Sequence, residues 1–270
     1  MSIKHFLLAS AFALTSSTAI ATEAEDISVY EFNQQLLNAT LWVEVSSEYK
    51  ALCHQAFNVA RYNLKQFVET SDGSPFAVVV DIDETVLSNA RYEAWLINQG
   101  VFHSGKRQKL WADAALAPAL PGAVDFLNEV KEMGGEVFYI TNRKDNTRDG
   151  TLQNLQNQGF PFADEQHLLT KSDTSDKSPR RAKVAEQFEI ALLIGDNLND
   201  FHEVFDTDSF KNTNLAVEEN KALFGTKYIV LPNPMYGEWE KKIYSGSWRL
   251  PNIEKTNLKN AALNPWLPSE

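Results

Sequence analysis

Four short, unbroken apolar runs constrain the fold of this chain more than any other feature. They are rich in β-branched residues, and their length suits strands that are covered on both faces of a sheet. The runs cover residues 76–80, 136–140, 191–194 and 228–231. Stretches with helical spacing lie between them, such as 123–133 and 147–158. Alternation of this kind predicts an α/β fold with a parallel sheet and helices on both of its faces.

The chain before the first run has a different rhythm. From about 28 to 70, apolar side chains recur at spacings of three and four residues, which is the pattern of one or two helices. The sequence Ser-Asp-Gly-Ser-Pro at 71–75 then breaks this pattern. We therefore expect a small, mostly helical lobe ahead of an α/β core at about 76–240, followed by a C-terminal segment at about 241–270.

Residues 1–21 have the features of a secretory signal peptide. A positively charged start and a short apolar run precede Ala19-Ile20-Ala21, which resembles a cleavage site. Cleavage after Ala21 predicts a mature chain of 22–270 that is periplasmic or secreted. No later apolar run reaches the roughly 18 residues that a membrane helix needs, so we expect no stable membrane anchor.

Charge and cysteine content exclude several classes of protein. Lys and Arg number 25 against 36 Asp and Glu, which gives a formal net charge of −11. A chain this acidic has no basic surplus for a nucleic-acid backbone, so we expect no nucleic acid as a partner. Cys53 is the only cysteine, which excludes an intramolecular disulfide and a cysteine zinc cluster. Val59 stands where a thiol-phosphatase loop would need an arginine.

Acidic or hydroxyl side chains follow three of the four apolar runs. They are Asp81 and Asp83 after the first run, Thr141 after the second, and Asp196 and Asp200 after the third. Ligands of open parallel sheets bind outside the carboxyl ends of the strands, so we expect these residues to share one edge. Carboxylates gathered there would repel one another unless a hard divalent cation lay between them, and Mg²⁺ prefers such oxygen ligands.

Carboxylates with Mg²⁺ are a usual arrangement for holding a phosphate group. One carboxylate can act as a nucleophile, and a second can protonate the leaving oxygen, for which Asp83 lies close to Asp81 in the sequence. Lys177 can supply positive charge, and Thr141 or Asn142 can donate hydrogen bonds to phosphoryl oxygens. Helix capping remains an alternative for each acidic motif alone, and a lone lysine is usually a solvated charge.

These residues resemble the motifs of the haloacid-dehalogenase-like (HAD) phosphohydrolases, whose sheet is Rossmann-like. The matching segments are Asp81-x-Asp83-x-Thr85, Thr141, Lys177 and Gly195-Asp196-x-x-x-Asp200. More narrowly, the four aspartates and the segments 139–145, 195–201 and 233–240 resemble the bacterial class C acid phosphatases and the related 5′-nucleotidase lipoproteins. The likeness extends from about Tyr30 to Ser245.

The resemblance implies a role for each matching carboxylate. Asp81 would be the nucleophile and a Mg²⁺ ligand. Asp83 would be the general acid and base, with its backbone carbonyl on the metal. Asp196 would be a further metal ligand, and Asp200 would orient Lys177 or a metal-bound water.

The resemblance also implies how the substrate would be held. Thr141 and Lys177 would bind the phosphoryl oxygens, with Lys171 as the alternative lysine. Aromatic rings at the mouth of the site would contact the leaving group, and a small cap would form near 88–118. The candidates are Tyr236 in the late motif and Tyr92, Trp95 and Trp111 in the cap, although core packing is the more common role of such rings.

The resemblance therefore implies a secreted, Mg²⁺-dependent acid phosphatase that hydrolyses small phosphomonoesters, such as nucleoside monophosphates and aryl phosphates, through an aspartyl-phosphate. A homodimer is plausible for such a protein. One departure concerns anchoring, because Thr22 stands where many relatives begin with a lipid-bearing cysteine. Two alternatives remain: a non-catalytic storage or binding protein with this fold, and a phosphotransferase of the same superfamily.

Overall fold

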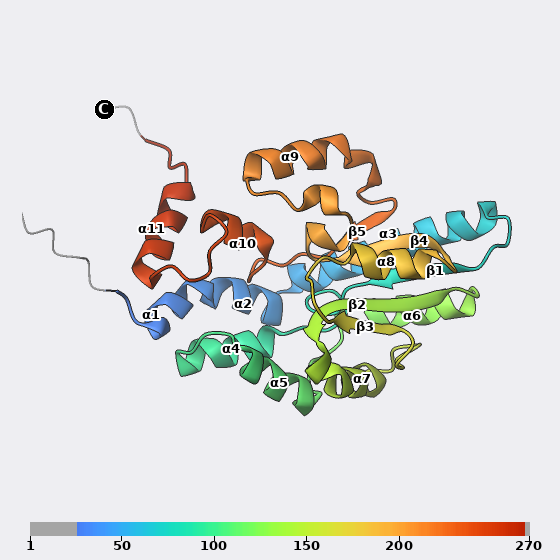
Figure 1. Cartoon of the computed structure of the whole chain (residues 1–270), viewed down its shortest axis with the longest axis horizontal. Coiled ribbons are helices and arrows are strands. Elements are labelled where there is room, and N and C mark those ends of the chain that lie inside the picture. The colour runs from blue at the N-terminus through green and yellow to red at the C-terminus, as the bar shows by residue number, and fades with distance from the viewer. Residues whose placement is uncertain (1–25, 268–270) are drawn as a thin grey trace, which may run out of the picture.

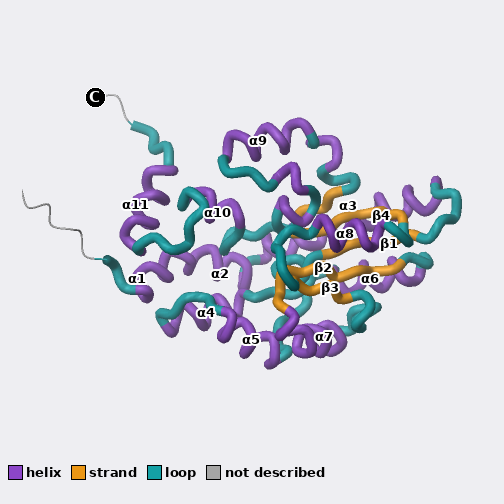
Figure 2. Tube along the Cα trace, in the orientation of Figure 1, coloured by secondary structure: helices purple, strands orange, loops and turns teal. Residues whose placement is uncertain are grey.

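The computed structural model describes residues 26–267. Within this part of the chain, five parallel strands form a sheet in the order β3-β2-β1-β4-β5 (Figures 1 and 2). The strands are β1 (Phe76–Val80), β2 (Glu136–Lys144), β3 (Leu168–Lys171), β4 (Glu189–Gly195) and β5 (Tyr228–Val230). The predicted Rossmann-like α/β fold is confirmed, and each of the four apolar runs marks a strand, with Leu231 of the last run just past the end of β5.

Strand β3 is the one that the sequence analysis missed. It is 4 residues long, lies at the edge of the sheet, and alternates between buried and half-buried side chains. A short edge strand of this kind has no continuous apolar run, because its two faces are not equally covered. Its sequence therefore lacks the signal that marks the other strands.

Helices cover both faces of the sheet, as predicted. One face carries α3 (Ser47–Thr70), α6 (Ala123–Glu132) and α7 (Arg148–Asn157), and the other carries α8 (Ser178–Ala185) and α9 (Phe210–Glu219). Every residue of β1 is buried. Because side chains alternate along a strand, Val78 and Val80 join the first core while Ala77 and Val79 join the second. This double burial explains why the strand is apolar throughout.

A second group of helices lies beyond the carboxyl ends of the strands. Its members are α1 (Val29–Asn33), α2 (Leu37–Val45), α4 (Ala90–Gln99), α5 (Gly105–Ala114), α10 (Glu238–Ile243) and α11 (Asn252–Ala262). Helices α1 and α2 contact α4, and α11 contacts α1 and α10. The first and last described helices therefore lie side by side (Figure 1).

The helical segment expected at 28–70 is divided between these two groups. Ser46 ends α2 with extended backbone, and it caps α3 because its hydroxyl accepts a 3.0 Å hydrogen bond from the backbone N–H of Tyr49 in the first turn of that helix. The long helix α3 then buries Cys53, Phe57 and Leu64 against the sheet. Of the helices in this segment, α1 and α2 belong to the second group, while α3 is part of the main core.

No helix among residues 26–267 is both long and apolar enough to cross a membrane. The predicted signal peptide at 1–21 lies outside the described residues.

Candidate active site

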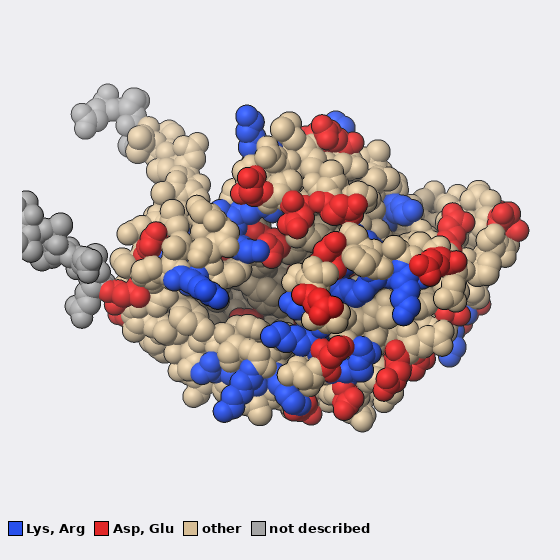
Figure 3. All heavy atoms as spheres, in the orientation of Figure 1, with Lys and Arg blue, Asp and Glu red and all other residues tan. Residues whose placement is uncertain are grey.

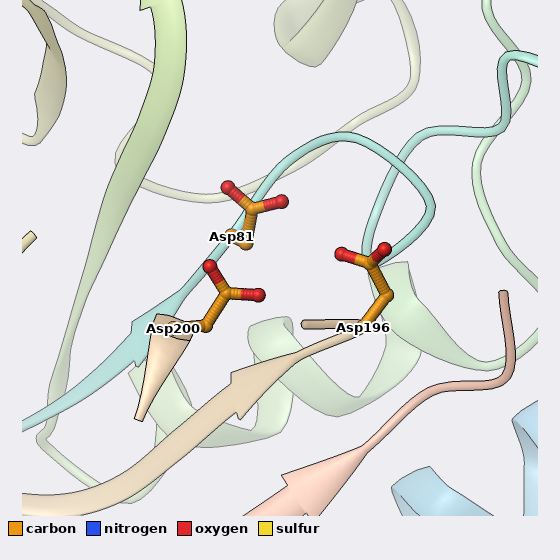
Figure 4. Close-up of side chains that lie close together, drawn as sticks. All are labelled: Asp81, Asp196 and Asp200. Carbon is orange, nitrogen blue, oxygen red and sulfur yellow. The ribbon is translucent and has the colours of Figure 1, made fainter. Parts of the chain in front are cut away.

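Three carboxylates meet at the carboxyl-terminal edge of the sheet, where the neighbouring strands β1 and β4 end. Asp81 directly follows β1, and its backbone N–H donates a 2.9 Å hydrogen bond to the carbonyl of Ile194 in β4. Asp196 and Asp200 follow β4. One carboxylate oxygen from each aspartate lies within 4.8 Å of the others (Figure 4). The strand order changes direction between β1 and β4, because β2 and β3 lie on one side of this point and β5 lies on the other. Open α/β sheets bind ligands at such a point.

A glycine allows Asp200 to fold back into this cluster. A Cβ atom at Gly195 would collide with the carboxylate of Asp200, so no larger residue fits at the end of β4 without a shift. The Asp200 carboxylate accepts a 3.0 Å hydrogen bond from the backbone N–H of Asn197, which closes the turn. The spacing Gly195-Asp196-x-x-x-Asp200 thus has a direct steric reason.

Lys177 provides the positive charge of the cluster. It precedes α8, is only 4% exposed, and its Nζ contacts the carboxylate of Asp81 and lies 2.6 Å from that of Asp200. Burial opposes the charged form of Lys177, but the two aspartates outweigh it and raise the pKa of the ammonium. Lys171 is placed differently, because its Nζ donates to the hydroxyl of Ser175. The geometry therefore favours Lys177 over Lys171 as the phosphate-binding lysine.

The aspartates carry more negative charge than one lysine can neutralise. Burial, with repulsion from Asp200 and Asp81, raises the pKa of Asp196 well above its ordinary value. The Asp196 carboxylate accepts a 2.9 Å hydrogen bond from Asn233 and lies 3.4 Å from the hydroxyl of Thr85. Clustered carboxylate oxygens with residual negative charge fit a hard divalent cation.

Asp83 turns away from this cluster toward Arg143. The guanidinium Nη2 and Nε of Arg143 lie 2.8 Å and 3.0 Å from Asp83 Oδ1, and Asn89 Nδ2 donates to the same oxygen at 2.7 Å. Burial would raise the pKa of Asp83, but Arg143 and Asn89 outweigh it and hold the pKa below its ordinary value. The structure thus gives Asp81 and Asp83 different environments although they are two residues apart.

Arg143 and Asn89 are site residues that the sequence analysis did not assign. Arg143 is 2% exposed, a burial that arginine tolerates only when it is paired. Asn89 also accepts a 2.7 Å hydrogen bond from the indole N–H of Trp111 and donates to Glu84. Glu84 is fully buried, and its carboxylate accepts a hydrogen bond from the hydroxyl of Tyr236. The available signal was position alone, since Arg143 lies inside the segment 139–145 and Asn89 follows the motif Asp81-x-Asp83-x-Thr85.

Thr141 and Asn142 lie in the last part of β2, not after it as the sequence predicted, and they differ in exposure. Thr141 is fully buried, and its hydroxyl accepts a 3.1 Å hydrogen bond from the backbone N–H of Arg143. Asn142 lines the cleft, and its amide donates a 3.0 Å hydrogen bond to the carbonyl of Ser175. Both were expected to contact phosphate, and that contact stays a prediction; Asn142 lines the cleft, whereas the Thr141 hydroxyl bonds the backbone beside it.

A cleft of about 1210 Å³ opens above the aspartates. Figure 3 shows a hollow in this face of the molecule, with Lys and Arg side chains along its rim. Tyr92, Trp111 and Tyr236 line the cleft. Tyr92 stacks on both Trp111 and Trp95, with 6.1 Å between ring centroids in each pair. Trp95 is 42% exposed and is not among the residues that line the cleft, so the aromatic wall consists of the other three candidates.

This fold and this site define a class of protein. A parallel sheet that presents paired aspartates after its first strand, and a lysine and further aspartates around its fourth, is the arrangement of the haloacid-dehalogenase-like proteins. The predicted superfamily is thus confirmed by the architecture as well as by the motifs.

Comparison with known proteins specifies the family. The sequence model of HAD superfamily subfamily IIIB (acid phosphatase) matches residues 4–239, so the chain belongs to that family. The proteins of this superfamily use a divalent metal, which agrees with the acidic cluster. The family that the sequence motifs suggested is therefore confirmed.

Individual relatives agree with this assignment. The class C acid phosphatase from Bacillus anthracis, solved with tungstate bound, is 36% identical with a TM-score of 0.84, over 87% of this chain and 98% of that one. A second structure of the same enzyme gives the same identity and TM-score over 99% of its chain. Acid phosphatase 1 from Solanum lycopersicum is 34% identical in an alignment of 143 residues that covers 49% of this chain. That match spans about half, 54%, of the tomato protein.

Proposed function

We propose that this protein is a secreted, Mg²⁺-dependent acid phosphatase that hydrolyses small phosphomonoesters through an aspartyl-phosphate on Asp81. The observation that carries the proposal is the position of the Asp81 carboxylate, which contacts the Lys177 ammonium and lies within 4.8 Å of the carboxylates of Asp196 and Asp200. Family membership supports it. So does the tungstate of the B. anthracis relative, because tungstate is a tetrahedral oxyanion like phosphate.

The proposed reaction has two displacements at phosphorus. An Asp81 oxygen forms a bond to phosphorus while the bond to the leaving oxygen breaks, and Asp83 gives that oxygen a proton. Asp83 then takes a proton from water, whose oxygen attacks phosphorus and releases Asp81. Lys177 attracts the phosphoryl oxygens. A cation held by Asp81 and Asp196, with Asp83 contributing its backbone carbonyl, would neutralise further charge on those oxygens.

Two features support an acidic optimum and a broad choice of ester. The first step needs a protonated Asp83, and Arg143 holds the pKa of that carboxyl low, so its protonated fraction grows as the pH falls. The cleft wall of Tyr92, Trp111 and Tyr236 presents apolar ring surface to a leaving group. Nucleoside monophosphates and aryl phosphates carry planar groups that match such a wall.

The location of the protein is part of the proposal. The signal-peptide features of residues 1–21 support export to the periplasm or the medium. Thr22 at the expected mature start supports a form without a lipid anchor. Homodimerisation stays a prediction from the family.

Hydrolysis of p-nitrophenyl phosphate, assayed across acidic and neutral pH, tests the function. We expect EDTA to abolish turnover and added Mg²⁺ to restore it. Asp81→Asn should lose at least about 10³-fold in kcat, because the nucleophile is gone, while the circular dichroism spectrum stays that of the parent protein. Turnover that survives both EDTA and Asp81→Asn would refute the mechanism.

A further inference from the structure

The cleft extends well beyond the aspartates. Its volume of about 1210 Å³ exceeds the roughly 300–1,000 Å³ of ordinary small-molecule sites. The end away from Asp81 is lined by residues of α1, α4, α10 and α11 and of the loops after α4 and α10. We call this end the distal chamber and define it by Phe32, Leu96, Phe102, Tyr244, Trp248 and Lys255. Five of these six side chains are aromatic or aliphatic, and charged residues such as Glu240, Lys241 and Arg249 also line this part of the cleft.

One buried cation faces this apolar chamber. Lys255, on α11, is 6% exposed, and its Nζ lies 5.4 Å, 5.2 Å and 5.9 Å from the ring centroids of Phe32, Phe102 and Tyr244. All three rings line the cleft, so the ammonium lies among its wall residues. Among residues 26–267, none forms a hydrogen bond or an ion pair with this ammonium. Aromatic faces offset part of the cost of burying a charge, but they do not replace an anion.

Lys259, one helical turn after Lys255, is a cation in similar surroundings that does have an ion-pair partner. Lys259 Nζ lies 4.9 Å from the Phe32 ring centroid and 5.8 Å from that of Tyr244. It also forms a 2.9 Å ion pair with Glu240, and it is not among the residues that line the cleft. The two lysines share Phe32 and Tyr244 as neighbours, and only Lys259 has an ion-pair partner among residues 26–267.

The nearby acidic groups do not supply that anion. Glu240 is held by Lys259 and by the hydroxyl of Tyr244, and Asp26 accepts a 2.7 Å hydrogen bond from the backbone N–H of Ile253. Glu93 also lines the cleft at 8% exposure, and burial raises its pKa to about 8. At neutral and acidic pH this carboxyl is therefore mostly uncharged. The chamber thus keeps a cation without a matched counter-charge.

We propose that the distal chamber binds the far end of the substrate, and that this end carries an anionic group which pairs with Lys255. The substrate class is then an elongated phosphomonoester. Its phosphate lies at Asp81, its middle is apolar or aromatic, and a carboxylate or similar anion lies at the end opposite the ester. This inference rests on the proposed phosphatase activity and adds the leaving group that the site selects.

A series of alkyl phosphates of increasing chain length tests the proposal. Each is paired with the compound of equal length that carries a carboxylate at its far end. Once the chain is long enough to reach Lys255, the carboxylate should raise kcat/KM by about 10-fold or more, the usual worth of a partly buried charge-assisted contact. The matched non-hydrolysable phosphonates, titrated by calorimetry, should show the same preference as a difference in Kd.

Two variants locate the preference. Lys255→Met keeps the length of the side chain without its charge, and it should abolish the preference for the carboxylate. Lys255→Arg should retain it. The double variant Lys259→Met/Glu240→Gln is the control, because it removes the neighbouring ion pair as a whole and leaves Lys255 in place, and it should keep the preference. Melting temperatures show whether either substitution loosens α11.

The outcomes separate this inference from the proposed function. If the parent protein hydrolyses p-nitrophenyl phosphate but shows no preference for carboxylate-bearing esters at any length, the distal site is refuted and the phosphatase stands. A preference that survives Lys255→Met refutes the role of that lysine. If the protein hydrolyses no ester, the proposed function fails, and the phosphonate titrations still report on the chamber.

Discussion

The two ends of the cleft treat buried charge in opposite ways. At the edge of the sheet, Lys177 pairs with Asp81 and Asp200, and Arg143 pairs with Asp83. In the distal chamber, Lys255 has no ion-pair partner among the described residues, although it is as well buried. At the first end, side chains of the protein neutralise much of the buried charge, and a bound cation would neutralise the rest. At the second end, the charge of Lys255 is available to pair with an anionic group of the ligand.

The ends also differ in how the sequence builds them. The carboxyl-terminal edge of the sheet uses short segments at the ends of β1, β2 and β4, so residues close in the sequence act together. The distal chamber joins α1 and α11, from the first and last described parts of the chain. We infer that the chemistry depends on local motifs, whereas the choice of substrate depends on how distant helices pack.

The largest expected effect lies at the end of the cleft beside the sheet. Lys177→Met should lower kcat/KM for p-nitrophenyl phosphate by about 10³-fold, because the phosphoryl oxygens lose their fixed cation. The thermal midpoint should also fall, since Asp81 and Asp200 would keep buried charges without a partner. Lys171→Met is the matched control, and we expect it to stay within about 2-fold, as usual for surface changes. Equal losses in the two variants would contradict the assignment of Lys177.

Much of the sheet edge could be predicted from the sequence. The apolar runs predicted four strands, and topology alone implied that Asp81 and Asp196 would meet, because parallel strands end at one edge. Strand β3 was missed because its burial alternates, and a segment like Leu168–Lys171 gives no continuous signal. Local patterns therefore predicted the parts whose burial is uniform.

The partners of the site residues could not be predicted in the same way. Arg143 and Asn89 were visible in the sequence, but their roles depend on Asp83 turning away from the metal cluster. Lys255 gave no signal at all, since a lysine on an amphipathic helix is ordinarily solvated. Its burial follows from the contact between α11 and α1, which are joined only by the tertiary fold.

The buried carboxyl of Glu93, which lines the cleft, gives a prediction for stability. Burial raises the pKa of Glu93 to about 8 from an ordinary value near 4.5. The folded state therefore keeps the Glu93 proton up to about pH 8, whereas the unfolded state releases it as the pH rises above 4.5. Between these two values the free energy of unfolding falls as the pH rises. Glu93→Gln should match the parent near pH 4.5 and exceed it by roughly 4 kcal/mol near pH 8. Urea denaturation across this range measures the difference.

The control for this prediction is a carboxyl in an ion pair. Glu129 accepts a 2.5 Å hydrogen bond from Arg61 and is only partly buried. Glu129→Gln should give no gain in stability on raising the pH. If Glu93→Gln and Glu129→Gln behave alike from pH 4.5 to 8, the Glu93 carboxyl is solvated, and the contrast between the two ends of the cleft weakens.

The smallest effect concerns the aromatic wall that joins the two ends. Trp111→Phe keeps a ring in the cleft but removes the indole N–H that donates to Asn89, which in turn holds Asp83. We expect kcat/KM for aryl phosphates to fall by about 10-fold, the usual cost of one lost hydrogen bond to a buried polar group. Trp95→Phe, at an exposed ring with no such bond, should change it by less than about 2-fold. A larger loss from Trp95→Phe would mean that the wall extends past Tyr92, so that substrate contacts the outer ring as well.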